Sequence, residues 1–135
     1  MKKAGSLSIC MIAMLFFAAG AAEAANWQRI SEYEDRIIYI DNDSIRHISQ
    51  TITGAQFKIE LKEPSWVKLK SIDYYLIEQE NNCGNKKYKV HQVNVYYDDG
   101  TNEIFKEKEE YDVKSDTFQY VIYQFMCEKT KQQVQ

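Results

Sequence analysis

The sequence predicts an α+β domain: a single antiparallel β-sheet of about five to six strands, a short helical turn after the second strand and a C-terminal helix packed on the sheet. Two observations predict the sheet: the chain has ten tyrosines but one proline, and its Val/Ile runs are separated by turn clusters at short intervals. A third observation predicts the helix: the apolar residues near the C-terminus recur at helical spacing and do not alternate.

Residues 1–24 are predicted to be a cleavable secretory signal peptide. Lys2 and Lys3 provide its positive start, Ile9 to Ala19 its apolar stretch, and small residues follow. The A-x-A match that ends at Ala24 predicts cleavage between Ala24 and Ala25.

A retained membrane anchor is the alternative, but the apolar stretch is shorter than the roughly 18–20 residues of a spanning helix. Cys10 lies inside this stretch directly after Ile9, where a lipidation site needs a small residue. We therefore expect an exported protein that is not lipidated and has no transmembrane segment after cleavage.

Cleavage leaves a chain whose length suits one domain, predicted over residues 25–130, followed by a polar tail at 131–135. Losing Lys2, Lys3 and Glu23 changes the formal net charge from −3 to −4. This balance argues against a nucleic-acid partner and against attachment to anionic membranes by bulk charge. The cleaved chain also keeps only Cys83 and Cys127, and two cysteines in an exported protein typically form one disulfide.

The first half of the chain predicts three strands. Trp27 to Ser31 and Ile37 to Ile40 are the first two, and Asp41 to Ser44 then offer capping oxygens for a helical turn at Ile45 to His47. The third strand covers Ala55 to Leu61, where apolar and polar residues alternate strictly. Gly54 predicts a bend at its start, and Glu63-Pro64-Ser65 predicts its end, because proline cannot donate to a strand ladder.

Two long strands, Trp66 to Glu78 and Lys87 to Tyr97, are predicted to form a hairpin around the loop 80–85. The parity of their apolar residues changes partway along each strand. One extra residue in a ladder has this effect, which predicts bulges near Lys70-Ser71 and near His91-Gln92. The alternative is that both faces of these strands are covered.

Asp98 to Thr101 form a strong turn signal, and Ile104 to Lys108 read as a short edge strand protected by charged residues. The final helix is predicted from Thr117 to about Lys129, with Ser115 or Asp116 as its cap.

No pattern of catalytic residues is present in the sequence, so we expect a protein that is not an enzyme and has no cofactor. His47 and His91 lack metal-ligand spacing, and no metal site is predicted. Asp41-x-Asp43 begins like a calcium loop, but the later ligands and the central glycine are missing. A turn with a helix cap explains these two residues better.

Two surface features remain as candidate binding sites. Lysines are frequent in the middle of the chain. They either solvate a face of the sheet or form an electrostatic binding surface. These lysines are Lys62, Lys68, Lys70, Lys86, Lys87 and Lys89. Tyrosines should lie close together on the hairpin, at Tyr74, Tyr75, Tyr96 and Tyr97, and such clusters suit protein interfaces. Adjacent tyrosines point to opposite faces, however, so half of them should be core.

The order of features resembles the surface-adhesin protein E family of Gram-negative bacteria. The resemblance rests on Trp27, Tyr39-Ile40-Asp41, Ser44-Ile45, a Trp- and Lys-containing strand, the stretch Glu78 to Cys83 with Tyr88 beyond it, Asp98-Asp99-Gly100, and Cys127 in a C-terminal helix. It covers the chain from Trp27 to Cys127. Asn82 departs from the acidic residue expected before the first cysteine.

The resemblance implies a Cys83–Cys127 disulfide that ties the hairpin loop to the terminal helix. It also implies an exported, non-enzymatic role in binding a protein, such as a matrix or envelope protein, or a structural role. The family's named member is a surface lipoprotein, whereas this chain lacks the lipidation cysteine, so both the periplasm and the cell surface remain open. The alternative function is a periplasmic inhibitor of a lysozyme-type hydrolase, which would present a protruding loop such as 80–86 or 98–103.

Overall fold

The structure is a computed structural model that describes residues 25–133. The predicted signal peptide, with Ala24 of its cleavage site, and residues 134–135 lie outside the described residues. The strands are β1 (Trp27–Glu32), β2 (Arg36–Asp41), β3 (Arg46–His47), β4 (Ile52–Val67), β5 (Lys70–Asn82), β6 (Lys87–Tyr97), β7 (Asn102–Lys106) and β8 (Glu110–Asp112). A 3-10 turn, η1, covers Asn42–Ser44, and the helix α1 covers Phe118–Gln133.

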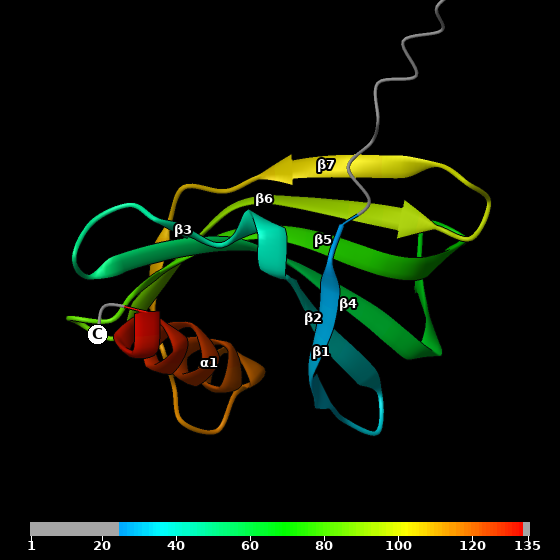
Figure 1. Ribbon diagram of the computed structural model, residues 1–135. Helices are drawn as coiled ribbons and strands as arrows, with labels where there is room; N and C mark the ends of the chain where they lie inside the picture. Colours follow the sequence, from blue (N-terminus) through cyan, green and yellow to red (C-terminus); the bar gives the residue numbers. More distant parts are fainter. Residues whose placement is uncertain (1–24, 134–135) are drawn as a thin grey trace, which may run out of the picture.

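All eight strands described belong to one antiparallel sheet with the order β1-β2-β4-β5-β6-β7, in which β3 pairs with β4 and β8 with β6. Figure 1 shows that the sheet curves over α1 and that the helix lies beneath only part of it. The predicted fold class, an antiparallel sheet with a C-terminal helix packed on it, is confirmed. The strand count differs because β3 and β8, of two and three residues, give too little pattern to be found in the sequence.

The main core lies between α1 and the face of the sheet that we call the helix face. Phe57 and Ile59 of β4 and Ile77 of β5 point to this face and pack against Ile122 and Met126 of α1. Their neighbours Gln56, Lys58 and Glu60 are only partly buried, as the strict alternation in this strand predicts. A smaller cluster of Ile72, Val95 and Tyr97 extends the apolar layer along the sheet.

The disulfide Cys83–Cys127 joins the β5–β6 loop to α1, with the two Cα atoms 5.6 Å apart. The hydroxyl of Tyr123 donates a hydrogen bond to the carbonyl of Cys83 at 3.2 Å. The helix is therefore held to the end of the hairpin by one covalent bond and one polar contact.

Three buried amides add a polar connection between helix and sheet. Gln79 and Gln119 exchange hydrogen bonds through both ends of their amides, at 2.7 and 3.1 Å, and Gln79 also donates to Asn81 at 3.0 Å. Gln79 and Asn81 have no solvent exposure. Because a buried amide is costly without partners, this network favours one placement of α1 on the sheet.

The helical turn predicted at Ile45 to His47 is wrong in position. The turn is η1, at Asn42–Ser44, and Arg46 and His47 form β3. Asp41 caps η1, because its carboxylate accepts a hydrogen bond from the backbone N–H of Asp43 at 3.1 Å. The same carboxylate accepts from the N–H of Asn26 at 3.0 Å.

The third strand was predicted to end at Glu63-Pro64-Ser65, but β4 continues to Val67. The register between β4 and β5 breaks between Glu60 and Ser65. Pro64 lies within this break, where the ladder needs no N–H from it.

The predicted strand from Trp66 to Glu78 is also wrong, because a two-residue turn divides it. Val67 pairs with Lys70, and Lys68 and Leu69 form the turn between β4 and β5. The parity change that suggested a bulge near Lys70-Ser71 comes from this reversal of the chain. A bulge does occur in β5, but at Asp73.

The bulge predicted near His91-Gln92 is confirmed: Glu78 pairs with Gln92 and Gln79 with Val90, which leaves His91 as the extra residue. The edge strand β7 begins two residues earlier than predicted and ends at Lys106.

The helix start is close to its prediction, but neither Ser115 nor Asp116 directly precedes it. Thr117 directly precedes the helix, and its hydroxyl donates a hydrogen bond to the carbonyl of Lys114 at 2.7 Å. At the other end, α1 continues to Gln133, so part of the predicted polar tail is helical.

Candidate binding surface

The face of the sheet opposite α1 is covered by no helix among the described residues, and we call it the open face. Its residues form rows across neighbouring strands because paired residues point to the same side. One row is Tyr39, Lys58, Leu76, Asn94 and Ile104, and the next is Ile37, Glu60, Tyr74, Tyr96 and Asn102. Each row crosses the five strands β2, β4, β5, β6 and β7.

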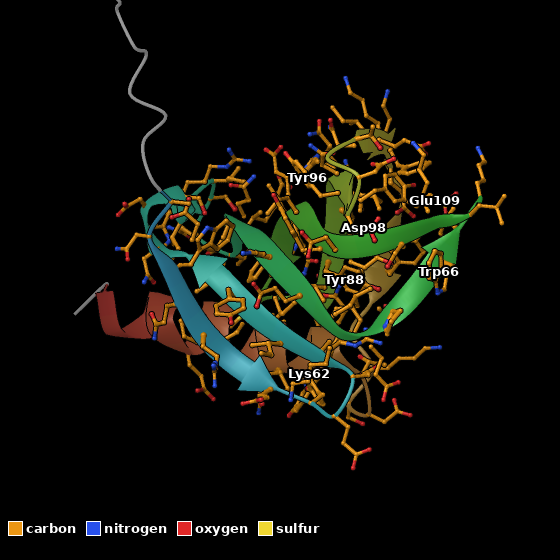
Figure 2. The ribbon with its side chains drawn as sticks, turned by 90° about the vertical axis from the view of Figure 1, so that its right-hand side faces the viewer. Lys62, Trp66, Tyr88, Tyr96, Asp98 and Glu109 are labelled. Atoms are coloured by element: carbon orange, nitrogen blue, oxygen red, sulfur yellow. A yellow bond between two sulfur atoms is a disulfide. The ribbon has the colours of Figure 1, made fainter. Side chains whose placement is uncertain are left out.

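A continuous group of aromatic and cationic side chains lies at the centre of these rows. The rings of Tyr74 and Tyr96 are stacked, with centroids 4.5 Å apart. The ammonium group of Lys58 lies 4.9 Å from the ring centroid of Tyr74 and 5.8 Å from that of Tyr39. We call Tyr39, Lys58, Tyr74, Asn94 and Tyr96 the tyrosine–lysine face; Figure 2 labels Tyr96.

Polar contacts fix the positions of Lys58, Asn94 and Tyr96 in this group. The amide nitrogen of Asn94 donates to the hydroxyl of Tyr96 at 3.0 Å, and Asn102 donates to the amide oxygen of Asn94 at 2.9 Å. Lys58 also forms an ion pair with Glu60 at 3.1 Å. Side chains that are ordered before binding lose less conformational entropy when a partner docks, so this arrangement favours binding.

The electrostatics of the face keep the hydroxyl of Tyr74 neutral. Partial burial and the neighbouring Tyr96 raise the pKa of Tyr74, whereas the ammonium group of Lys58 acts to lower it. The hydroxyl therefore keeps its proton at neutral pH. It is available as a hydrogen-bond donor beside an apolar ring, which is the combination that makes tyrosine frequent at protein interfaces.

The structure divides the four predicted tyrosines between the two faces. Tyr74 and Tyr96 stack on the open face, while Tyr97 belongs to the smaller core cluster with 4 % exposure. Tyr75 packs against the core of the helix face, and burial raises the pKa of its hydroxyl. Sequence reasoning missed Tyr39, Lys58 and Asn94, because the strand register that brings them to this face is not visible in any single segment.

The two predicted lysines, Lys68 and Lys70, lie at the β4–β5 turn and not on the tyrosine–lysine face. Lys70 donates to the hydroxyl of Thr101 at 3.0 Å and lies 3.5 Å from the carboxylate of Asp99. Hydrogen bonds from Thr101 hold the pKa of Asp99 below its usual value, with a smaller contribution from the charge of Lys70. Of the four predicted tyrosines, Lys70 thus lies beside Tyr97, at 5.3 Å from its ring centroid, and not beside the Tyr74–Tyr96 stack.

His91 and Asp41 each make a structural contact of their own. His91 lies 2.9 Å from the carboxylate of Glu80, and His47 is exposed on β3. The carboxylate of Asp41 caps η1, as described above. Within residues 25–133, no group of three or more His, Cys, Asp or Glu side chains is placed to hold a metal ion.

A hollow of about 460 Å³ lies between β6, β8 and the residues before α1. Its lining consists of Tyr88, Glu110, Tyr111, Asp112, Lys114 and Thr117. The rings of Tyr88 and Tyr111 lie 5.5 Å apart, and the hydroxyl of Tyr111 donates to Glu107. Hydroxyl, carboxylate and lysine side chains thus line this hollow, with no histidine or cysteine among them.

The part of the chain that the structure describes includes no helix long and apolar enough to span a bilayer.

Comparison with known proteins finds one matching family and similar folds. The model of the family described as Surface-adhesin protein E matches residues 27–128. A crystal structure of Haemophilus influenzae protein E (crystal form II) is similar with a TM-score of 0.60 and 18% identity, over 78% of this chain and 90% of that one. A second structure of that protein has a TM-score of 0.59 and 18% identity, over 79% and 87%. At this identity the structural likeness shows the fold, and no curated protein matches by sequence.

Proposed function

This chain belongs to the surface-adhesin protein E family, and from this premise we propose that it is an exported, non-enzymatic domain that binds a protein through its tyrosine–lysine face. The signal peptide predicted over residues 1–24 supports export, and the absence of a lipidation cysteine there favours a free protein. Such a protein would work in the periplasm or at the cell surface, with an envelope or matrix protein as its ligand.

One observation carries the proposal: a pre-arranged aromatic and cationic surface lies on the side of the sheet that α1 leaves uncovered. Tyr74 stacks on Tyr96 with Lys58 beside it, and Asn94 holds the hydroxyl of Tyr96 by a hydrogen bond. Aromatic side chains with a polar end are enriched at the centres of protein interfaces. The core of the domain lies on the opposite face.

The hydrolase inhibitor, the alternative from the sequence, would present the loop 80–86 or 98–103 to an active-site cleft. The first loop is bonded to α1 through Cys83, and the second is held by Lys70 through Thr101 and Asp99. These contacts favour a broad binding face over an inserted loop.

The test measures binding of the mature protein to a panel of purified extracellular-matrix proteins and to lysozyme by surface plasmon resonance. We expect saturable binding to a matrix protein, and a loss of affinity of about tenfold or more for Tyr74→Ala and for Tyr96→Ala, because truncated aromatic residues at an interface centre have effects of this size. Lys58→Ala should act in the same direction.

Tyr120→Ala is the matched control, because Tyr120 is a partly buried tyrosine of α1, on the other side of the sheet. It should bind like the wild type, provided that circular dichroism shows all variants to be folded. Binding to lysozyme alone would replace the proposed function with the inhibitor. Unchanged affinity in Tyr74→Ala and Tyr96→Ala would show that another surface binds the partner.

A further inference from the structure

The turn between β4 and β5 exposes an unusual amount of apolar surface. We call residues 66–70 the hairpin tip. The exposed fractions are 66% for Trp66, 38% for Val67 and 96% for Leu69. Figure 2 shows Trp66 on the part of the hairpin that extends beyond the body of the sheet.

The apolar side chains of the hairpin tip point in several directions. Val67 pairs with Lys70, whose ammonium group lies 5.3 Å from the ring centroid of Tyr97, so Val67 points to the helix face. Trp66, the preceding residue in the strand, points to the open face. Leu69 lies in the turn itself, so apolar surface covers both sides and the end of the tip.

Folding does not explain this choice of residues. Lys68 and Leu69 have φ angles of 48° and 67°, in the left-handed region. Two-residue hairpin turns of this kind favour Asn-Gly, because other side chains are strained there. Leu69 is therefore unfavourable both for its backbone conformation and for its exposure, and such a combination points to a function outside folding.

We propose that the hairpin tip inserts into the interface of a phospholipid bilayer that contains anionic lipids. Tryptophan and aliphatic side chains partition into this interface, and lysine side chains can extend from it to the headgroups. Lys68 and Lys70 flank Leu69 directly. Because Lys70 is paired with Asp99, Lys68 supplies most of the charge that complements the anionic headgroups.

The shape of the tip favours a bilayer over a flat protein surface. A flat partner could cover one side of the hairpin and would leave either Trp66 or Val67 in water, whereas a bilayer closes around both sides and the end. The attraction is local, so it does not depend on the net charge of the chain, which is negative. The hairpin tip lies apart from the tyrosine–lysine face, so this attachment goes beyond the proposed protein binding.

The experiment mixes the mature protein with vesicles of phosphatidylethanolamine and phosphatidylglycerol, or of phosphatidylcholine alone, and measures the protein that sediments with them. We expect sedimentation with the anionic vesicles, less with phosphatidylcholine, and a blue shift of tryptophan fluorescence. Trp66→Ser and Leu69→Gly should each lower the partition coefficient about tenfold.

Leu69→Gly separates binding from folding, because glycine relieves the strained φ angle and should raise the Tm while vesicle binding falls. Ile104→Ser is the matched control: it removes another exposed aliphatic side chain, with 54% exposure on β7, and should leave vesicle binding unchanged.

Absence of wild-type sedimentation with the anionic vesicles would overturn the proposal. So would an equal loss in Ile104→Ser, or unchanged vesicle binding in Trp66→Ser and Leu69→Gly. If those two variants keep vesicle binding but lose affinity for a matrix protein, the tip docks into a protein pocket and the lipid proposal is wrong.

Discussion

Replacing both Cys83 and Cys127 with alanine is expected to lower the free energy of unfolding by about 4 kcal/mol. The disulfide closes a loop with a sequence separation of 44 residues, and the chain-entropy model gives this value for a loop of that length. The loss is a large part of the roughly 5–15 kcal/mol of total stability that is typical of a small domain. Urea denaturation followed by circular dichroism measures it.

Reductant provides the control for this prediction. Adding it to the wild-type protein should reproduce the stability of the double variant, whereas adding it to the double variant should change nothing. A loss of less than about 1 kcal/mol would mean that the non-covalent contacts of α1 hold the helix without the cross-link.

Gln79→Ala is expected to lower the free energy of unfolding by about 3 kcal/mol. The substitution leaves a cavity at a position without solvent exposure, and it removes both amide partners of Gln119 and the donor to Asn81. Each buried polar group without a partner costs about 1–3 kcal/mol. Thermal and urea denaturation of the single variant measure the effect.

A double-mutant cycle tests whether the two glutamines act together. Gln79→Leu combined with Gln119→Leu should cost less than the sum of the two single variants, because replacing both partners by apolar side chains leaves neither amide unsatisfied. Strict additivity would contradict the paired arrangement of the two amides.

The parts of the fold that were predicted correctly are those where one face of a strand is buried and the other is in water. In β4 the alternation from Ala55 to Leu61 reports this directly, and the structure buries Ala55, Phe57 and Ile59 as expected. The bulge at His91 was also detectable, because one extra residue moves every following side chain to the other face.

The β4–β5 turn shows why the same signal can mislead. A reversal of the chain and a bulge both change the parity of the apolar residues. The usual turn residues, glycine or asparagine, are replaced here by Lys68 and Leu69, so nothing local marked the reversal. Leu69, which makes the turn hard to recognise, is also one of the residues that the proposed membrane contact would use.

The candidate site could be predicted only in part. The rule that adjacent tyrosines point to opposite faces anticipated that Tyr74 and Tyr75 would separate, and the structure places them on opposite faces. Lys58 and Tyr39 could not be assigned to the site, because their proximity to Tyr74 depends on how β2, β4 and β5 are aligned. Register of this kind comes from long-range pairing and is not contained in any short segment.

Hydroxyl-radical footprinting of the protein bound to the matrix protein that the binding assay selects tests the central claim most directly, because it reports the solvent access of individual side chains. We predict that Tyr39, Tyr74 and Tyr96 become protected in the complex, while Tyr120 of α1 reacts as it does in the free protein. Protection confined to α1 or to the β5–β6 loop, with Tyr74 and Tyr96 unchanged, would contradict the claim that the tyrosine–lysine face is the binding surface.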